Sequence, residues 1–371
     1  MIPVNTPIFQ GNEKKYLNEC IDTGWISSEG PFVKKFEDQI AKFIDQKYAT
    51  ACSNGSAALD LAVKALDLKL GDEVIMPSFT IISCAQSLVN QGVKPVLVDC
   101  HYDTFNMKAE LIEPLITSKT KAIMIVHIYG LSVDIDPILE TSKKYNLKII
   151  EDAAEVIGLN YKGKKCGSFG DVTTLSFYPN KHITTGEGGM VLTNDPHIDK
   201  KLKGLRNLCF SPDSGKRFIH DDLGWNYRMT NIQAALGVAQ FEQIDKFIDK
   251  KRQIGATYNK LLKGINSINL PIHKTSYCEN IYWVYAVTLK DDLEKNASQI
   301  ITELSSFGIG ARPFFYPMHR QPVFNKMGLF KDEKHLNSSK LYEKGFYIPS
   351  GLALTNDDMN KVSTILHKNL N

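Results

Sequence analysis

The feature that most constrains the fold is an alternation, between residues 50 and 200, of short apolar runs with stretches of helical pattern. The apolar runs are hydrophobic on both faces, as a strand must be when helices cover both sides of its sheet. They span residues 72–77, 95–99, 122–127 and 147–152. A helix-like stretch near residues 109–116 follows the second run. Strands of this kind separated by helices indicate an α/β fold with a mostly parallel sheet.

Polar residues gather at the ends of these runs, namely Ser78, Thr80, Asp99, His127 and Asp152. The carboxyl ends of parallel strands meet at one edge of an open sheet, and ligands of α/β proteins bind beyond that edge. We therefore expect the functional site to lie there.

The pattern changes near residue 240. Residues 241–262 form a long amphipathic stretch rich in Lys and Asp, which suits a helix that leaves the large domain. A strand-like run at 281–289 follows, and helical patterns cover 297–307 and 357–370. We predict a large domain over residues 1–240 and a small C-terminal α+β domain over residues 241–371.

Charge and composition argue against several classes of protein. The 44 basic and 41 acidic residues leave a net charge of +3, so the chain has no basic footprint for nucleic acid. No apolar segment is long enough for a membrane span, and the N-terminal residues lack the pattern of a secretory signal. The seven cysteines are scattered without a C-x-x-C pair, which favours reduced thiols in a cytoplasmic protein and gives no support for a metal site.

Lys181 stands in the most informative segment, residues 176–189, among Pro, Asn, Thr and several glycines. An isolated lysine is ordinarily a solvated surface charge. Here no neighbouring acid can form a helical ion pair with it, and the glycines let the backbone approach a flat or anionic group. A lysine in a partly desolvated pocket becomes a usable amine nucleophile.

Asp152 ends the apolar run at 147–152. A lysine that binds pyridoxal phosphate covalently and a carboxylate at the pyridine nitrogen are the pair that pyridoxal chemistry needs. The carboxylate keeps the ring nitrogen protonated, and Ala154 is small enough for a ring to lie against it. Asp152 could also be a simple strand-end cap, and the residue alone leaves the two interpretations equal.

Gly55 and Ser56 lie in the segment 53–59, at the start of a helical pattern. Free backbone N–H groups and the positive end of a helix dipole suit a phosphate there. Ser176 could add a hydroxyl to the same phosphate. Taken alone, this segment is better interpreted as an ordinary helix N-cap.

Together these segments resemble the DegT/DnrJ/EryC1/StrS family of sugar aminotransferases, which are fold-type-I pyridoxal-phosphate enzymes. The likeness runs nearly end to end, and the order of its motifs makes it specific. The motifs lie at residues 24–28, 55–59, 71–75, 151–154, 167–171, 176–189, 224–231 and 312–319. The resemblance implies a large domain with a mostly parallel seven-stranded sheet between helices. Within the family the chain looks most like the perosamine-synthase branch.

The resemblance implies roles for matching residues. Lys181 would hold pyridoxal 5′-phosphate and move the proton, and Asp152 would pair with the ring nitrogen. Gly55, Ser56 and Ser176 would bind the phosphate. Asn226 would reach the cofactor of a neighbouring subunit, which makes a homodimer the smallest working unit. The residues expected to face a sugar nucleotide are aromatic or cationic, and they are Trp25, Tyr227, Arg228, Arg312, Tyr316 and His319. For Tyr227, Tyr316 and Phe315, core packing is an equally open interpretation.

Three residues depart from the family's pattern. Glu155 stands where many members have Gln or His beside the phenolic oxygen of the cofactor, so it should be protonated, turned away or share a proton. Ile81 stands where an aromatic side chain often covers the cofactor ring, and it can cover the ring only by dispersion. His182 makes the segment similar to a branch of sugar 3-dehydratases that has His in place of the lysine. Because Lys181 is present, transamination remains the expectation.

The expected reaction passes the amine of L-glutamate to a nucleotide-linked 4-keto-6-deoxy sugar. The product, a 4-amino-4,6-dideoxy sugar, would feed a surface polysaccharide such as O-antigen, by analogy alone. GDP, dTDP and UDP remain open as the nucleotide, as do the stereochemistry of the sugar and amination at C3. Two alternatives are a 3-dehydratase and a non-catalytic regulator that keeps the pyridoxal fold.

Overall fold

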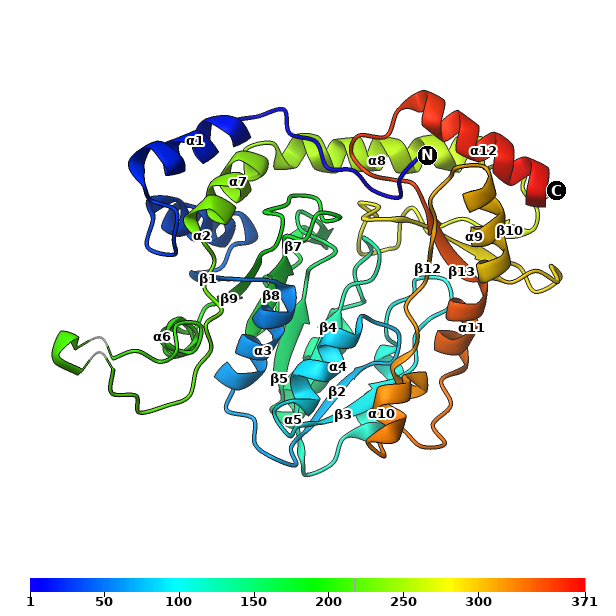
Figure 1. Ribbon diagram of the computed structural model, residues 1–371. Coiled ribbons are helices and arrows are strands. Elements are labelled where there is room, and N and C mark those ends of the chain that lie inside the picture. The colour runs from blue at the N-terminus through cyan, green and yellow to red at the C-terminus, as the bar shows by residue number, and fades with distance from the viewer. Residues whose placement is uncertain (212, 217, 371) are drawn as a thin grey trace.

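The computed structural model describes residues 1–211, 213–216 and 218–370. Its centre is a seven-stranded sheet within this described part (Figure 1). The strand order is β1 (Tyr48–Cys52), β9 (Gly189–Thr193), β8 (Val172–Ser176), β5 (Lys148–Asp152), β4 (Thr120–Val126), β2 (Glu73–Pro77) and β3 (Lys94–Val98). The five strands from β8 to β3 run parallel, whereas β9 is antiparallel to both of its neighbours. The mostly parallel seven-stranded sheet is therefore confirmed.

Two hydrophobic cores lie on opposite faces of this sheet. In β4, Ile123 and Ile125 face one core, and Ala122 and Met124 face the other. This alternation explains why the strands are apolar on both faces. The first core also contains residues of α2 (Pro31–Ile44), α5 (Asp136–Tyr145) and α7 (Asn231–Phe241). The second contains residues of α3 (Gly55–Ala65), α4 (Ile82–Val89) and α6 (Pro196–Leu205).

A second, antiparallel sheet is built from the C-terminal third of the chain. Its strand order is β10 (Ile268–Asn269), β11 (Tyr285–Leu289), β13 (Gly345–Ile348) and β12 (Arg312–Pro313). Helices α9 (Ala297–Ser306), α11 (Leu336–Lys344) and α12 (Asn356–Leu370) lie beside it (Figure 1). Ile2, near the N-terminus, is buried in the hydrophobic core of this sheet.

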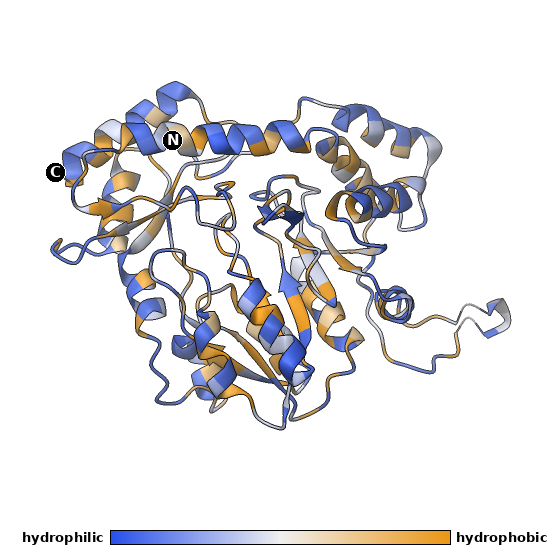
Figure 2. Cartoon of the chain, turned by 180° about the vertical axis from the view of Figure 1, so that it is seen from behind, coloured by the Kyte–Doolittle hydropathy of each residue, from blue (hydrophilic) through white to orange (hydrophobic). Residues whose placement is uncertain are grey.

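The long helix α8 (Ile244–Leu261) runs along the top of the molecule, from α7 to the side of α12 (Figure 1). Its first turns bury Ile244 and Phe247 in a core of the large sheet, and its later turns bury Ile254 and Tyr258 in the core of the small sheet. One apolar stripe at helical spacing therefore joins the two sheets. Figure 2 shows this helix as a mixture of hydrophilic and hydrophobic residues, whereas the strands below it are largely hydrophobic.

The remaining elements are short or peripheral. They are α1 (Glu13–Thr23), α10 (Pro322–Lys326), the hairpin of β6 (Asn160–Tyr161) and β7 (Lys164–Lys165), and the 3₁₀ turns η1 (Ala109–Leu111), η2 (Glu113–Leu115), η3 (Ser214–Lys216) and η4 (Met318–Arg320). The helical pattern expected near 109–116 forms only two 3₁₀ turns, and Pro114, which has no N–H to donate, lies in the second. Within the described residues, no helix has both the length and the hydropathy needed to cross a membrane.

Candidate active site

A cavity of about 620 Å³ opens beyond the carboxyl ends of β4, β5 and β8. Its walls include most of the residues that the sequence singled out for a cofactor, namely Gly55, Ser56, Ile81, Asp152, Ala154, Glu155, Ser176 and Lys181. These residues come from α3, the start of α4, the end of β5, the end of β8 and the loop that follows β8. The fold thus brings together segments that are distant in the sequence, at the edge where a parallel sheet binds its ligands.

Lys181 lies in the loop between β8 and β9, and its side chain is only 11% exposed. Its Nζ is 3.8 Å from Oε1 of Glu155 and 4.0 Å from the centre of the Trp283 ring. Burial lowers the pKa of the amine, although the carboxylates of Glu155 and Asp152 oppose that change. An amine in this setting is neutral more readily than a surface lysine and can act as a nucleophile or a base.

Glu155 is the buried acid that faces this amine. Its Oε2 accepts a 2.8 Å hydrogen bond from the backbone N–H of Tyr129, a residue with a left-handed φ of 56°. Burial raises the pKa of this carboxyl, and the charge of Lys181 opposes the change. The carboxyl group therefore holds a proton more readily than an exposed glutamate does.

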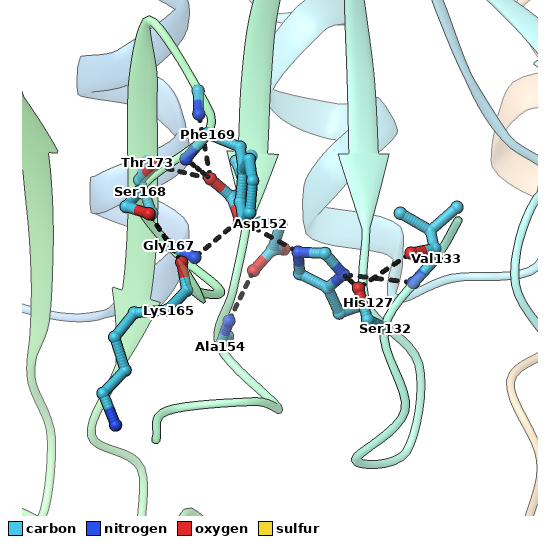
Figure 3. Close-up of polar contacts among 12 residues, drawn as sticks. His127, Ser132, Val133, Asp152, Ala154, Lys165, Gly167, Ser168, Phe169 and Thr173 are labelled. Atoms are coloured by element: carbon cyan, nitrogen blue, oxygen red, sulfur yellow. Dashed lines mark hydrogen bonds and ion pairs between the residues drawn. The ribbon is translucent and has the colours of Figure 1, made fainter. Parts of the chain in front are cut away.

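Asp152 ends β5 with its carboxylate beside the cavity. Oδ1 accepts a hydrogen bond from the N–H of Ala154 at 3.0 Å (Figure 3), and Oδ2 accepts one from the thiol of Cys84 at 3.3 Å. Burial and the charge of Asp152 together raise the pKa of Cys84 well above its usual value, so this thiol remains a donor. The carboxylate is thereby held by two donors at the floor of the site.

A second buried acid, Glu151, anchors the strand that carries Asp152. His127 Nδ1 accepts from the N–H of Val133, so its Nε2–H donates to Glu151 Oε1 at 3.0 Å. Further donors to the same carboxylate are the N–H groups of Gly167, Phe169 and Gly170 and the hydroxyl of Thr173, at 2.6, 2.8, 2.9 and 3.2 Å. Although burial opposes it, hydrogen bonds from His127 and these amides lower the pKa of Glu151.

The far end of the cavity suits an anion. The N-cap Asn54 accepts a 2.8 Å hydrogen bond from Ala57 N–H, and Ser56 Oγ lies 2.8 Å from Ser83 Oγ at the start of α4. A Cβ on Gly55 would come within 2.9 Å of the Ser176 Cβ, so only glycine lets the helix start approach the end of β8 this closely. The N–H groups at the start of α3 and the serine hydroxyls are the donors that a phosphate needs.

Several expected residues lie outside the lining of this cavity in the described part of the chain. Asn226 pairs its backbone with Asn207, and Arg228 Nη1 donates to the Asn207 side chain at 2.8 Å. Tyr227 donates to Asp60 at 3.2 Å and stacks on Trp225, while Trp25 is about half exposed.

On the small-sheet side, Arg312 lies exposed on the edge strand β12, and Tyr316 packs edge-on against Tyr342. His319 is buried between Ser78 Oγ at 2.8 Å and Ser339 Oγ at 3.1 Å. Burial lowers the pKa of His319 to about 4, so its imidazole is neutral at physiological pH.

Three aromatic residues of the cavity wall, Trp283, Phe315 and Tyr347, were not assigned to the cofactor from the sequence. Ser83 and Thr174 also line the cavity without having been predicted. Within the described residues, the buried Thr174 hydroxyl and the Asn180 side-chain oxygen have no hydrogen-bond partner in the protein.

The residues present therefore fit pyridoxal 5′-phosphate. An amine lies beside a buried carboxylate pair, a small residue follows Asp152, and an anion-binding helix start stands at the other end. A metal site has no comparable support, because the described residues contain no group of three or more His, Cys, Asp or Glu side chains able to hold an ion.

Residues 7–367 match the family model of the DegT/DnrJ/EryC1/StrS aminotransferases. The chain is 43% identical to a GDP-perosamine synthase of Caulobacter vibrioides, over 98% of this chain and 97% of that protein. It is 40% identical to a GDP-perosamine synthase of Vibrio cholerae over the whole of both chains. The solved structure of Spr1654 from Streptococcus pneumoniae, a proposed sugar aminotransferase in its PLP form, superposes with a TM-score of 0.91 at 25% identity and covers all of both chains. The chain therefore belongs to the DegT/DnrJ/EryC1/StrS aminotransferase family, a family of pyridoxal-phosphate enzymes, and the fold and cofactor expected from its sequence are confirmed.

Proposed function

We propose that the protein transfers the amine of L-glutamate to C4 of a nucleotide-linked 4-keto-6-deoxy sugar. The observation that carries this proposal is the buried amine of Lys181, in one cavity with Asp152 and with Gly55 and Ser56 at the start of α3. The names of the two relatives favour GDP as the nucleotide and perosamine, a 4-amino-4,6-dideoxy sugar, as the product. Such a sugar would enter a surface polysaccharide.

When bound, pyridoxal phosphate supplies an aldehyde that accepts amines and an electron-withdrawing ring that makes a neighbouring C–H acidic. The chain's own residues supply position and proton transfer. Asp152 would keep the ring nitrogen protonated, and Gly55, Ser56 and Ser176 would hold the phosphate. The amine of Lys181, whose pKa burial lowers, would serve as the base that accepts the proton of that C–H and as the acid that returns it. Trp283, Phe315 and Tyr347 place aromatic rings on the wall of the cavity.

We infer that a second copy of the chain completes the site. Asn226 and Arg228 lie outside the cavity in one chain, and the described residues just before them, 206–211, 213–216 and 218–223, project from the body at the left of Figure 1. That segment exposes large apolar side chains, since Phe218 is 79% and Leu223 is 83% exposed. Apolar groups displayed on a projecting segment suit burial against another protein surface. A symmetric dimer would bring the same residues to both sites.

The division into a large domain over residues 1–240 and a small domain over 241–371 remains part of the proposal. It is supported by the change from the large to the small sheet along α8. A cytoplasmic location is also proposed, because the cysteines of the described chain are all free thiols.

The test is a mass-spectrometric screen of purified protein with L-glutamate and 4-keto-6-deoxy sugars carried on GDP, dTDP and UDP. An amino sugar on GDP is the expected product, and Lys181→Ala should abolish it while Lys69→Ala, at an exposed lysine, should leave it unchanged. Release of ammonia with a deoxygenated sugar would instead identify a 3-dehydratase. Tight cofactor binding without turnover of any sugar would support a regulator.

A further inference from the structure

Lys251 is a buried lysine on α8 that the proposed reaction does not use. It is 3% exposed, and its amine donates to the backbone oxygens of Trp283 at 2.7 Å and Ser350 at 2.5 Å. No carboxylate of the described residues raises its pKa through an ion pair. Because burying an unpaired ammonium is costly, we expect the amine at this position to have a specific structural role.

The two oxygens that it binds lie at neighbouring strand ends. Trp283 precedes β11 by two residues, and Ser350 follows β13 by two residues. Two turns further along α8, the hydroxyl of Tyr258 donates to Pro349 O at 2.9 Å. A buried polar side chain of helix α8 thus holds the residues that lead into β11. An apolar side chain at this position would leave the backbone oxygens without a hydrogen-bond partner.

Trp283 in turn contacts the catalytic lysine. The centre of its ring is 4.0 Å from Lys181 Nζ, and its indole N–H donates to Asn180 O at 2.8 Å. The side chain therefore touches the amine of Lys181 and also fixes the backbone immediately before it. In its ammonium form, the Lys181 side chain is attracted electrostatically to the face of the indole ring.

The backbone at Trp283 allows little freedom. Tyr282 has a left-handed φ of 50°, and its N–H donates to Asn280 Oδ1 at 2.6 Å. A Cβ on Gly130 would come within 2.5 Å of Trp283 N, so the two loops are in close contact. A bulky residue in this conformation persists only when its surroundings hold it there. The hydrogen bond from Lys251 to the backbone oxygen of Trp283 is one of the contacts that hold it.

We propose that Trp283 and Lys251 are positioning residues for the catalytic amine: Trp283 holds the amine of Lys181 against its ring, and Lys251 holds Trp283. The inference rests on the proposed role of Lys181.

Two further observations support the assignment. Burial lowers the pKa of Lys251 to about 7, so near neutral pH the amine is often uncharged, and its two N–H groups match the two backbone oxygens. Burial, and next the charge of Lys251, lower the pKa of His182 to about 3. Lys251 therefore lies close enough for its charge to act on His182, the residue that follows Lys181.

The test measures the amine itself in cofactor-free protein. Trinitrobenzenesulfonate reacts with neutral amines, and mass spectrometry of the peptide that contains Lys181 gives its rate of labelling. Trp283→Leu should speed this labelling severalfold, because the ring no longer covers the amine. Lys251→Met should have an effect of the same direction and similar size, and the double variant should add nothing to either single variant. Lys246→Met, at an exposed position of the same helix, is the matched control and should label like the wild type.

A wild-type rate in Trp283→Leu would show that the ring does not hold the amine. Additive effects in the double variant would show that Lys251 does not act through Trp283. Trp283→Phe, which keeps an aromatic face, should restore slow labelling, whereas a general loosening of the fold would not be reversed this way. If Lys251→Met fails to fold, Lys251→Gln, which keeps one donor group, should give an intermediate rate, and a wild-type rate there would contradict the proposal.

Because no sugar is present in this assay, its outcome is independent of the substrate. Failure of the proposed function would appear as absent turnover with the labelling pattern intact. In the loaded enzyme, both variants should lower kcat while the KM for the keto sugar changes little, since the amine and not the sugar is misplaced.

Discussion

At the residue scale, the site is governed by one buried acid facing one buried amine. Burial moves the pKa of Glu155 up and that of Lys181 down, so both groups are drawn toward their neutral forms. Their 3.8 Å separation works in the opposite direction, because each charged form stabilises the other. The departure of Glu155 from the family's usual Gln or His therefore has a physical consequence, which is a second proton-holding group beside the reactive amine.

Glu155→Gln should move the titration of the Lys181 amine to lower pH. The substitution removes the carboxylate that favours the ammonium form and leaves burial in place. The measurement is the pH dependence of Lys181 labelling in cofactor-free protein. Glu140→Gln, at an exposed glutamate, should leave the midpoint unchanged. A midpoint that rises or stays fixed in Glu155→Gln would show that the two side chains do not interact.

Gly55→Ala tests the anion-binding end of the cavity. The added Cβ would meet the Ser176 Cβ at 2.9 Å, so either the helix start or the end of β8 must move. We expect the dissociation constant for pyridoxal phosphate to rise about tenfold or more, which corresponds to roughly 1.4 kcal/mol. Gly204→Ala in α6, where a Cβ would meet nothing within 4 Å, is the control and should leave the dissociation constant unchanged.

At the element scale, the sequence predicted what depends on local pattern. The run at 147–152 forms β5 over Lys148–Asp152, because strands buried on both faces must be apolar throughout. The run at 281–289 begins as a strand only at Tyr285, since Tyr282 has a left-handed φ that breaks the extended conformation. A positive φ at a tyrosine has no sequence signature, so this boundary could not be predicted.

For the candidate site, too, the residues with a local sequence pattern could be predicted, and those that depend on tertiary contacts could not. The structure places Lys181, Asp152 and Gly55 in the lining of one cavity, as their residue types and local patterns predicted. Trp283 was not predicted, because its contact with Lys181 depends on how α8 places the entry to β11, about a hundred positions along the chain. His319 was expected to face a substrate, and within one chain it binds Ser78 and Ser339 instead.

Glu151→Gln tests the anchor of β5. His127 and the backbone amides of Gly167 and Phe169 all donate hydrogen bonds to this carboxylate. The NH₂ group of a glutamine would face these donors and could not accept their hydrogen bonds. Removing one member of a buried, hydrogen-bonded charge network costs about 3–5 kcal/mol. Urea unfolding at neutral pH should show a loss of that order. Thr173→Val, which removes only the longest of these hydrogen bonds, should cost about 1 kcal/mol.

The loss of unfolding free energy in Glu151→Gln should depend on pH. The pKa of Glu151 is lower in the folded protein than in the unfolded chain, where a glutamate titrates near ~4.3. Its contribution to stability is therefore complete above that value and is lost as the pH falls toward the folded pKa. The difference in unfolding free energy between wild type and Glu151→Gln should shrink below about pH 4. A difference that grows in acid would mean that the carboxyl is protonated in the native state.

At the scale of the whole molecule, one chain gathers most of the residues predicted for the cofactor into one cavity and leaves several other predicted site residues outside it. The cavity gathers residues from α3, β5 and β8, whereas Asn226 and Arg228 lie elsewhere on the same chain. The projecting segment with Phe218 and Leu223 at its surface lies just before them in the sequence. These observations are consistent with each chain contributing this region to the site of its partner. A mixed dimer would distinguish that arrangement from a site formed within one chain.

The mixed dimer combines Lys181→Ala in one chain with Asn226→Asp in the other. The aspartate would place a negative charge beside the partner's phosphate and should weaken cofactor binding strongly. Each variant alone should be nearly inactive. When the two are co-expressed with different tags and purified through both, one site keeps Lys181 and receives an intact Asn226. Because a two-fold dimer has two equivalent sites, such mixed dimers should regain about half of the wild-type activity. If Asn226 served the site of its own chain, both sites of the mixed dimer would carry one defect, and no activity above that of the parents would return.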